Sequence, residues 1–343
     1  MITKELEDRI VRYLSHRMPE AGRVSVIALS RIHGGASRET FRVRIDQERG
    51  GERGLIFRRD PISTLIETER EVEFAAYRSF MGTQVPVPGA LYLERELEWL
   101  ERPFFVMEEV EGCIAGSILA ADPYGPHRQK IGEQFVTILG NIAKRDAATS
   151  DLAKHVPAVK PDEAWKVELA KWEKVVDEDE LEPQPILRAA MRWMRRNPPP
   201  PAQKISVVHG DYRTGNFLFD GTGAIRAVLD WEMAHVGDPL EDLAWALDPL
   251  WSSDRAHPGG MLTREAAIQV WEKASGLKAD PKALAWWTVF ASFKGAAIWI
   301  SSAKEFQAAT NTDPVMAFSG LYCLPFHNKR LADLLLQSRE AVQ

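Results

Sequence analysis

The most constraining feature of this 343-residue sequence is a set of three short apolar runs that interrupt a region of otherwise helical patterning. The runs are separated by turn-forming residues and cover residues 205–208, 217–219 and 224–229. Short apolar runs on either side of a glycine-containing turn, here DGTG, are typical of a β-hairpin. The last run ends at Asp230, so the hairpin should return this carboxylate to the side of Asp211 and Asn216, which lie in the preceding loop HGDYRTGN.

These three side chains predict a cation site. Carboxylate and amide oxygens suit a hard cation such as Mg²⁺. Phosphoryl transfer uses such a cation, together with a carboxylate that orients the acceptor hydroxyl and a positive charge near the phosphates. Asp211, Asn216 and Asp230 therefore indicate a magnesium site suited to phosphoryl transfer.

The loop HGDYRTGN resembles the HGD-x4-N catalytic loop of the aminoglycoside phosphotransferase family, and LDWE resembles the family's metal-binding aspartate motif. The family is related to the protein kinases, whose HRD-x4-N loop has the same spacing and whose DFG stands where LDWE stands here. The resemblance implies that Asp211 is the catalytic base or hydroxyl-orienting group. It also implies that Asn216 and Asp230 bind Mg²⁺, and that the nucleotide is ATP, with GTP as an alternative.

Other polar residues around these motifs are open to a structural interpretation. Two interpretations are open for Glu232: it contacts a second metal ion, or its side chain faces solvent. Asp238 and Asp242 are expected to cap the start of a helix and to rigidify the site. His209 is expected to pack and hydrogen-bond within its loop rather than to bind a ligand.

The rest of the sequence divides into a β-rich first third and a mainly helical remainder. Alternating apolar residues predict strands, and residues 65–80 predict one helix among them. We therefore expect an α+β, bilobal chain in which residues 1–108 form an antiparallel sheet lobe that binds nucleotide. Residues 109–343 should form a helical catalytic and substrate-binding lobe that contains the hairpin. The resemblance implies that this is the protein-kinase-like fold.

The nucleotide contacts are placed in the first lobe by the same resemblance. GGASRETFRV resembles the family's phosphate-covering loop, which implies contacts from Gly34, Gly35 and Ser37. Residues 104–112, FFVMEEVEG, resemble the inter-lobe hinge, where main-chain groups of Glu108 and Val110 would meet the adenine.

Arg58, in LIFRRDP, stands where protein kinases have the lysine that pairs with the phosphates. Arginine is always charged and can bind phosphate in a bidentate manner. Glu71, on the predicted helix, is our choice for its ion-pair partner, with Glu67 and Glu69 as alternatives.

The composition disfavours several classes of binding partner. A net charge of -6 argues against nucleic acid and anionic membranes as partners. The apolar residues 283–303 are interrupted by Lys294 and fit a core helix better than a membrane span. Cys113 and Cys323 form no disulfide framework, and the first residues lack a secretory signal, so a cytoplasmic location is expected. The sequence leaves the oligomeric state open.

The acceptor is expected to be a small molecule with a hydroxyl group and a largely apolar body. Aromatic residues are frequent between residues 284 and 332, where acidic residues are few. The sequence also resembles phosphotransferase domains fused to acyl-CoA dehydrogenases, which implies a hydroxyacyl thioester. The acidic run at residues 175–183 keeps an aminoglycoside acceptor as an alternative. A non-catalytic nucleotide-binding module is the other alternative, whereas a protein kinase is disfavoured because no APE-like segment follows Asp230.

Overall fold

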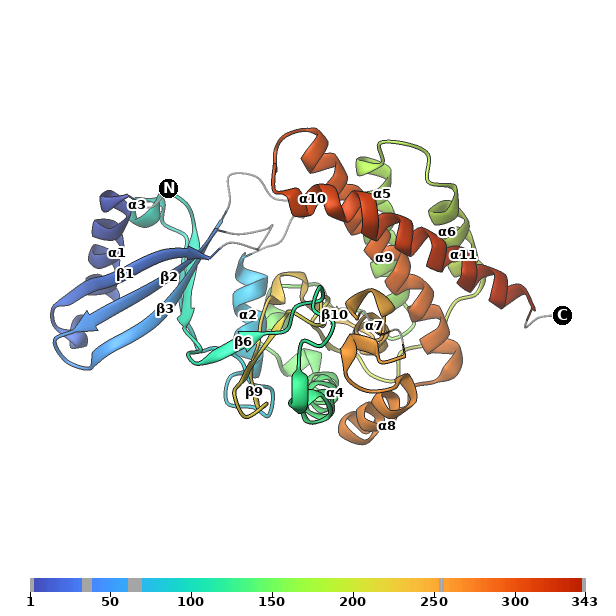
Figure 1. Cartoon of the computed structure of the whole chain (residues 1–343), viewed down its shortest axis with the longest axis horizontal. Helices are drawn as coiled ribbons and strands as arrows, with labels where there is room; N and C mark the ends of the chain where they lie inside the picture. The colour runs from blue at the N-terminus through green and yellow to red at the C-terminus, as the bar shows by residue number, and fades with distance from the viewer. Residues whose placement is uncertain (1–2, 33–38, 61–69, 253, 255, 341–343) are drawn as a thin grey trace.

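The computed structural model describes residues 3–32, 39–60, 70–252, 254 and 256–340 (Figure 1). Its first lobe is a five-stranded antiparallel sheet with the strand order β1-β2-β3-β5-β4. The strands are β1 (Val24–Ile32), β2 (Glu39–Gln47), β3 (Gly51–Arg59), β4 (Ala90–Glu94) and β5 (Phe104–Glu108). The helices of this lobe are α1 (Lys4–Arg17), α2 (Arg70–Phe80) and α3 (Leu97–Leu100).

The two faces of this sheet are covered by different helices because side chains alternate along each strand. Leu55 and Phe57 of β3 pack with α1 in one apolar cluster. Ile56 lies on the opposite face and belongs to the apolar cluster that contains Val72 and Tyr77 of α2. The same alternation turns the next residue on that face, Arg58, towards α2 and the second lobe.

The second lobe is mainly helical and lies on the right in Figure 1, whereas the five-stranded sheet lies on the left. Its helices are α4 (Arg128–Lys144), α5 (Ala164–Asp179), α6 (Pro185–Arg196), α7 (Leu240–Ala246), α8 (Arg264–Ser275), α9 (Pro281–Gln307), α10 (Pro314–Phe318) and α11 (Leu324–Glu340). Two small sheets cross it. One is formed by β6 (Cys113–Ala115), β8 (Phe217–Asp220) and β9 (Ile225–Val228), and the other by β7 (Ser206–Val208) and β10 (His235–Gly237).

The bilobal α+β architecture expected from the sequence is confirmed, with one difference in the small sheets. The hairpin is β8–β9, as predicted, but the first apolar run forms β7, which pairs with β10 rather than with the hairpin. The boundary placed between residues 108 and 109 stays a prediction. It coincides with the end of β5, and β6 already pairs with β8 of the second lobe.

Helix α9 is long and apolar enough to cross a membrane, but 83% of its most apolar window is buried inside the fold. Trp286, Trp287, Phe290 and Phe293 are all in the core, so these aromatic residues do not line a cleft. The aromatic wall expected from the sequence is therefore largely core. Aromatic side chains nearer the end of the chain are partly exposed, namely Phe306, Phe318 and Tyr322.

Candidate active site

The hairpin and the preceding loop bring the predicted site residues together through the backbone. The N–H of Leu229, directly after β9, donates to the carbonyl of Asn216 over 2.8 Å. His209 connects the two segments: its Nδ1 accepts from the N–H of Asp211 at 3.1 Å, and its Nε2 donates to the carbonyl of Leu229 at 2.9 Å. Asp230 follows directly. The loop and the end of the hairpin thus form one structural unit.

The carboxylate of Asp211 is held by three donors. It accepts from Nδ2 of Asn216 at 2.7 Å, from Nε of Arg213 at 2.9 Å and from Nε1 of Trp245 at 2.8 Å. Only 13% of the side chain is exposed. Contacts from three directions fix the orientation of the carboxylate, which is what a group that must meet an incoming hydroxyl requires.

Asn216 is oriented by the same contacts. Its Nδ2 donates both to the carboxylate and to the backbone carbonyl of Asp211, the latter at 2.8 Å. The amide nitrogen therefore faces Asp211, and the amide oxygen, the atom that could bind a cation, is turned away from it. Mg²⁺ accepts such carbonyl and carboxylate oxygens, so this orientation fits a magnesium ligand.

Asp230 adopts a left-handed backbone conformation with φ of 66°, which is uncommon for a residue other than glycine. Its N–H donates to the hydroxyl of Tyr77 on α2, which holds this turn against the first lobe. The side chain is 32% exposed, and its Oδ1 lies 3.0 Å from Arg58. Burial alone would raise the pKa of Asp230, but the Arg58 guanidinium outweighs it and holds that pKa below its ordinary value.

Arg58 is paired with α2, but not through the residue predicted from the sequence. Its Nη1 lies 2.7 Å from the carboxylate of Glu73, whose side chain is fully buried. The prediction of Glu71 as this partner is wrong, because Glu71 faces away and pairs with Arg70 and Arg95. Two residues along a helix are separated by roughly 200° of rotation, so only one of these acids can face the sheet.

The remaining predicted positions are placed as follows. Glu232 does not face solvent, because its side chain is only 15% exposed and its Oε2 lies 3.7 Å from Nη2 of Arg58. Contact of Glu232 with a second metal ion stays a prediction. At the hinge, the N–H of Glu108 already donates to Gly89, so a purine could meet only its carbonyl. Contacts of Glu108 and Val110 with adenine stay predictions. The other predicted positions, Gly34, Gly35, Ser37, Glu67 and Glu69, lie outside the described residues.

A family model described as the phosphotransferase enzyme family matches residues 28–287, which is most of the chain and includes the site described above. The chain belongs to this family.

Curated relatives of this phosphotransferase-family chain are acyl-CoA dehydrogenase family members. The chicken family member 11 is 26% identical over 243 residues, which are 68% of this chain and 30% of the relative. The mouse family member 10 is 27% identical over 226 residues, which are 62% of this chain and 19% of the relative. The chain thus spans less than a third of the length of these relatives. The predicted likeness to this subgroup is confirmed.

Solved structures of phosphotransferases share the fold. A Ralstonia eutropha protein, provisionally described as an aminoglycoside phosphotransferase, superposes with a TM-score of 0.74 and 20% identity, covering 95% of this chain and 97% of that one. The choline kinase of Streptococcus pneumoniae has a TM-score of 0.62 and 14% identity, covering 96% and 99%. The aminoglycoside phosphotransferase APH(4)-Ia, in a ternary complex with AMP-PNP and hygromycin B, has a TM-score of 0.61 and 14% identity, covering 96% and 98%.

Residues outside the motifs support the catalytic loop of this family member. Both carboxylate oxygens of Asp242 accept backbone N–H groups of the loop, from His209 at 2.7 Å and from Gly210 at 2.9 Å. Asp242 therefore rigidifies the site as predicted, although by holding the loop rather than by capping α7. Burial raises its pKa to about 6. Asp238 accepts from the N–H of Leu240 at the start of α7 and from Trp287.

Lys294 holds the other side of the loop, a role that was not predicted from the sequence. Its Nζ donates to the carbonyl of Gly210 at 2.6 Å and to Glu241 of α7 at 2.8 Å. The lysine and the glutamate are almost completely buried. Its ammonium also lies 5.2 Å from the ring centroid of Trp245, the residue that donates to Asp211. Lys294 is the only charged residue of the apolar stretch 283–303, and this was the available signal for the contact.

The Arg58–Glu73 pair yields a stability prediction with a matched control. Glu73→Gln should lower the free energy of unfolding by roughly 1–3 kcal/mol, because it leaves the buried Arg58 with one negative partner fewer. Glu71→Gln is the same change on the same helix, but it affects partly exposed pairs and should cost less than about 1 kcal/mol. Urea unfolding of both variants tests this. Equal losses would contradict the assignment of Glu73.

The buried imidazole of His209 makes stability depend on pH. Burial lowers its pKa from 6.5 to about 4, so between these values the unfolded chain binds a proton that the folded chain does not. The contribution of this group is therefore complete above pH 6.5 and is lost as the pH falls towards 4. We expect His209→Asn to reduce the loss of stability between pH 7 and 4.5 by roughly 2 kcal/mol. Urea titrations at each pH measure it, with the exposed His16→Asn as control; parallel curves for wild type and His209→Asn would refute it.

Proposed function

We propose that this chain transfers the γ-phosphate of ATP, in the presence of Mg²⁺, to a hydroxyl group of a small molecule. The observation that carries the proposal is the Asp211 carboxylate, held by three donors in the same structural unit as Asn216 and Asp230. The complex of APH(4)-Ia with AMP-PNP and hygromycin B supports a nucleotide and a small-molecule acceptor. A GDP complex of aminoglycoside 2'-phosphotransferase-IIIa keeps GTP as an alternative nucleotide.

In this proposal Asp211 takes the proton of the acceptor hydroxyl as the hydroxyl oxygen bonds to the γ-phosphorus. The bond between that phosphorus and the bridging oxygen breaks, and ADP leaves with the bond's electron pair. Asn216 and Asp230 would hold Mg²⁺, which supplies neutralisation of phosphate charge when it is bound. Arg58 lies 3.0 Å from Asp230 and is the cation that we expect to pair with the phosphates.

The acceptor that we propose has a largely apolar body, and a hydroxyacyl thioester is the leading candidate. The relatives named acyl-CoA dehydrogenase support this class. A pocket lined mainly by apolar side chains lies against Glu232 and Met233, which follow Asp230. An aminoglycoside is the alternative, because several structural neighbours are named for that activity.

A panel experiment tests the proposal. The protein is incubated with ATP and Mg²⁺ and with hydroxyacyl thioesters, simple hydroxy acids, alcohols and aminoglycosides, and phosphorylated products are identified by mass spectrometry. We expect a product that gains one phosphoryl group from the thioester class and that disappears with Asp211→Asn. Turnover of aminoglycosides alone would favour the alternative acceptor. Nucleotide binding without any product would instead indicate a non-catalytic nucleotide-binding module.

A further inference from the structure

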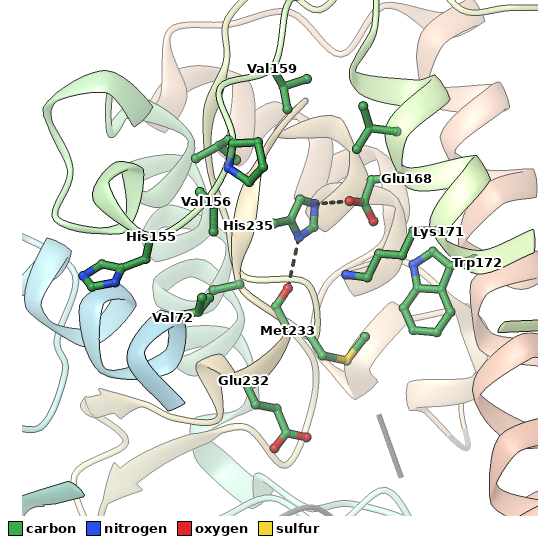
Figure 2. A pocket seen from close by; sticks show the side chains of 14 residues that line it. Val72, His155, Val156, Val159, Glu168, Lys171, Trp172, Glu232, Met233 and His235 are labelled. Carbon is green, nitrogen blue, oxygen red and sulfur yellow. Dashed lines mark hydrogen bonds and ion pairs between the residues drawn. The ribbon is translucent and has the colours of Figure 1, made fainter. Parts of the chain in front are cut away.

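A pocket of about 280 Å³ lies between α2, α5 and residues 232–236 (Figure 2). Its lining includes four valines, Val72, Val156, Val159 and Val236. The pocket adjoins the catalytic loop, because Met233, which lines it, packs its main chain against Gly210. A ligand in the pocket therefore lies close to the residue that precedes Asp211.

The buried charges of one wall balance one another. Nε2 of His235 lies 3.0 Å from Glu241 and 3.5 Å from Glu168, and its Nδ1 lies 3.0 Å from the carbonyl of Met233. Both ring nitrogens face acceptors, so both donate and the ring is an imidazolium. Although burial lowers the pKa of His235, Glu168 and Glu241 outweigh it and raise that pKa above its ordinary value. Glu241 is also paired with Lys294, so two carboxylates face two cations.

Lys171 adds a positive charge that this wall does not match. It lines the pocket from α5, and Figure 2 shows its ammonium turned towards His235 and Met233. It forms no ion pair with a carboxylate of the described residues, and its nearest aromatic ring is that of the adjacent Trp172, with the centroid 5.5 Å away. His155, on the far side of the view, contributes no negative charge. The α5 side of the pocket therefore has an excess of one positive charge.

The negative charge of the pocket lies at its other end. In Figure 2, Glu232 is well separated from Lys171 and its carboxylate is turned away. Its Oε2 lies 3.7 Å from Arg58, which also pairs with Glu73 and Asp230. Three carboxylates around one guanidinium leave an excess of two negative charges. This excess equals the charge of one divalent cation, which the proposed function places at Asp230.

We propose that the pocket binds the phosphate acceptor through an anionic group, a carboxylate or a phosphate, that pairs with Lys171. The apolar body of the acceptor then lies against the valines, and its hydroxyl points towards the Glu232 end. An anion neutralises the excess charge at α5, whereas an ammonium there would be repelled by Lys171. The identity of the ligand as the acceptor rests on the proposed function. Acids with a hydroxyl group and thioesters of phosphate-bearing carriers fit this arrangement, and polycationic aminoglycosides do not.

Four probes of similar length test the pocket without nucleotide: 6-hydroxyhexanoate, 6-hydroxyhexyl phosphate, 6-hydroxyhexanamide and 6-aminohexan-1-ol. Binding is followed by NMR through the ¹³C-labelled methyl group of Met233, identified by its loss in Met233→Leu. We expect at least one anion to bind about three- to fivefold more tightly than the amide, because Lys171 is exposed, and about tenfold more tightly than the amine.

The tighter of the two anions identifies the source, a carboxylic acid or a phosphate-bearing carrier. The preference should shrink in 0.5 M NaCl, since salt screens an exposed ion pair. Equal binding of the amide and both anions, or tightest binding of the amine, would overturn the proposal.

Two lysines of α5 give a matched comparison. Lys171→Met keeps much of the side-chain length but removes the charge, so the preference for the anion over the amide should fall to within about 1.5-fold. Lys174, exposed on the same helix, pairs with Glu178 and does not line the pocket, so Lys174→Met should keep the preference. An unchanged preference in Lys171→Met, or an equal loss in Lys174→Met, would contradict the role of Lys171.

The outcomes are separate from those of the phosphotransferase panel. Where a hydroxy acid is phosphorylated, Lys171→Met should raise its KM by about three- to fivefold and leave kcat within about twofold. Binding of anions at Lys171 in a protein that transfers no phosphate would contradict the proposed function and leave the anion site intact. Phosphate transfer by a protein whose pocket shows no preference for anions would contradict only the assignment of the pocket.

Discussion

Asp211→Asn is expected to lower kcat for γ-phosphate transfer by about 10²–10⁴-fold, which is the usual contribution of a positioned general base. The asparagine side chain is nearly the same size but cannot take the proton of the acceptor hydroxyl at neutral pH. Because no nucleotide contact is assigned to Asp211, the dissociation constant for the ATP analogue AMP-PNP should change by no more than about threefold. Single-turnover transfer and calorimetric nucleotide binding measure the two effects separately.

A matched control for this variant is Asp333→Asn on α11. Asp333 is half exposed and pairs only locally, with Lys329, so its replacement should leave kcat within about twofold of wild type. Transfer that proceeds at the wild-type rate in folded Asp211→Asn would contradict the role of this carboxylate. A parallel loss of nucleotide binding would instead assign Asp211 to binding.

Lys294→Met is expected to lower the free energy of unfolding by about 3–5 kcal/mol, because it leaves the buried Glu241 carboxylate without its ammonium partner. It also removes the donor to the carbonyl of Gly210, so any folded fraction should transfer phosphate more slowly. Urea unfolding, with transfer activity measured below the transition, gives both quantities.

A second lysine of α9 provides the control. Lys304 is 42% exposed and pairs with Asp179, so Lys304→Met should cost less than about 1 kcal/mol. The double variant Lys294→Met with Glu241→Gln should recover part of the stability lost in Lys294→Met, because the remaining buried group is then uncharged. Stability losses that simply add in the double variant would show that the buried Lys294–Glu241 pair does not cause the loss. Equal losses in Lys294→Met and Lys304→Met would show the same.

The centre of the site could be predicted from the sequence because its residues are close along the chain. Asp211 and Asn216 belong to one loop, and Asp230 follows a hairpin whose turn and apolar runs are readable. Local hydrogen bonds, such as that from Leu229 to Asn216, are what such a pattern specifies. The bilobal fold was predicted in the same way, from strand alternation in the first third and helical spacing in the rest.

The partner of Arg58 could not be fixed by the same reasoning. Several acids follow one another on the segment that contains α2, and the sequence does not show which of them faces the sheet. The choice depends on how α2 packs against the sheet, where Phe74 and Tyr77 contact Phe105, and this is a tertiary contact. That packing turns Glu73 inwards, so Glu71 was the wrong prediction.

The residues that hold the catalytic loop in place, such as Lys294, were not predicted for a related reason. Lys294 reaches Gly210 from a helix 84 positions further along the chain, and no local pattern encodes such a contact. The pairing of β7 with β10 joins two strands of three residues each, which are too short to show an alternation. Lys294, the only charge of the apolar residues 283–303, was visible in the sequence. Burial of this charge required a partner that only the fold reveals.

The most direct test of the central claim is the location of a divalent ion in a crystal of the protein grown with Mn²⁺ and AMP-PNP. Anomalous scattering identifies the manganese positions without ambiguity about waters. The structure predicts a manganese ion coordinated by the amide oxygen of Asn216 and the carboxylate of Asp230, with the Asp211 carboxylate beside the terminal phosphate. Manganese bound elsewhere, with neither Asn216 nor Asp230 among its ligands, would contradict the assignment of this site.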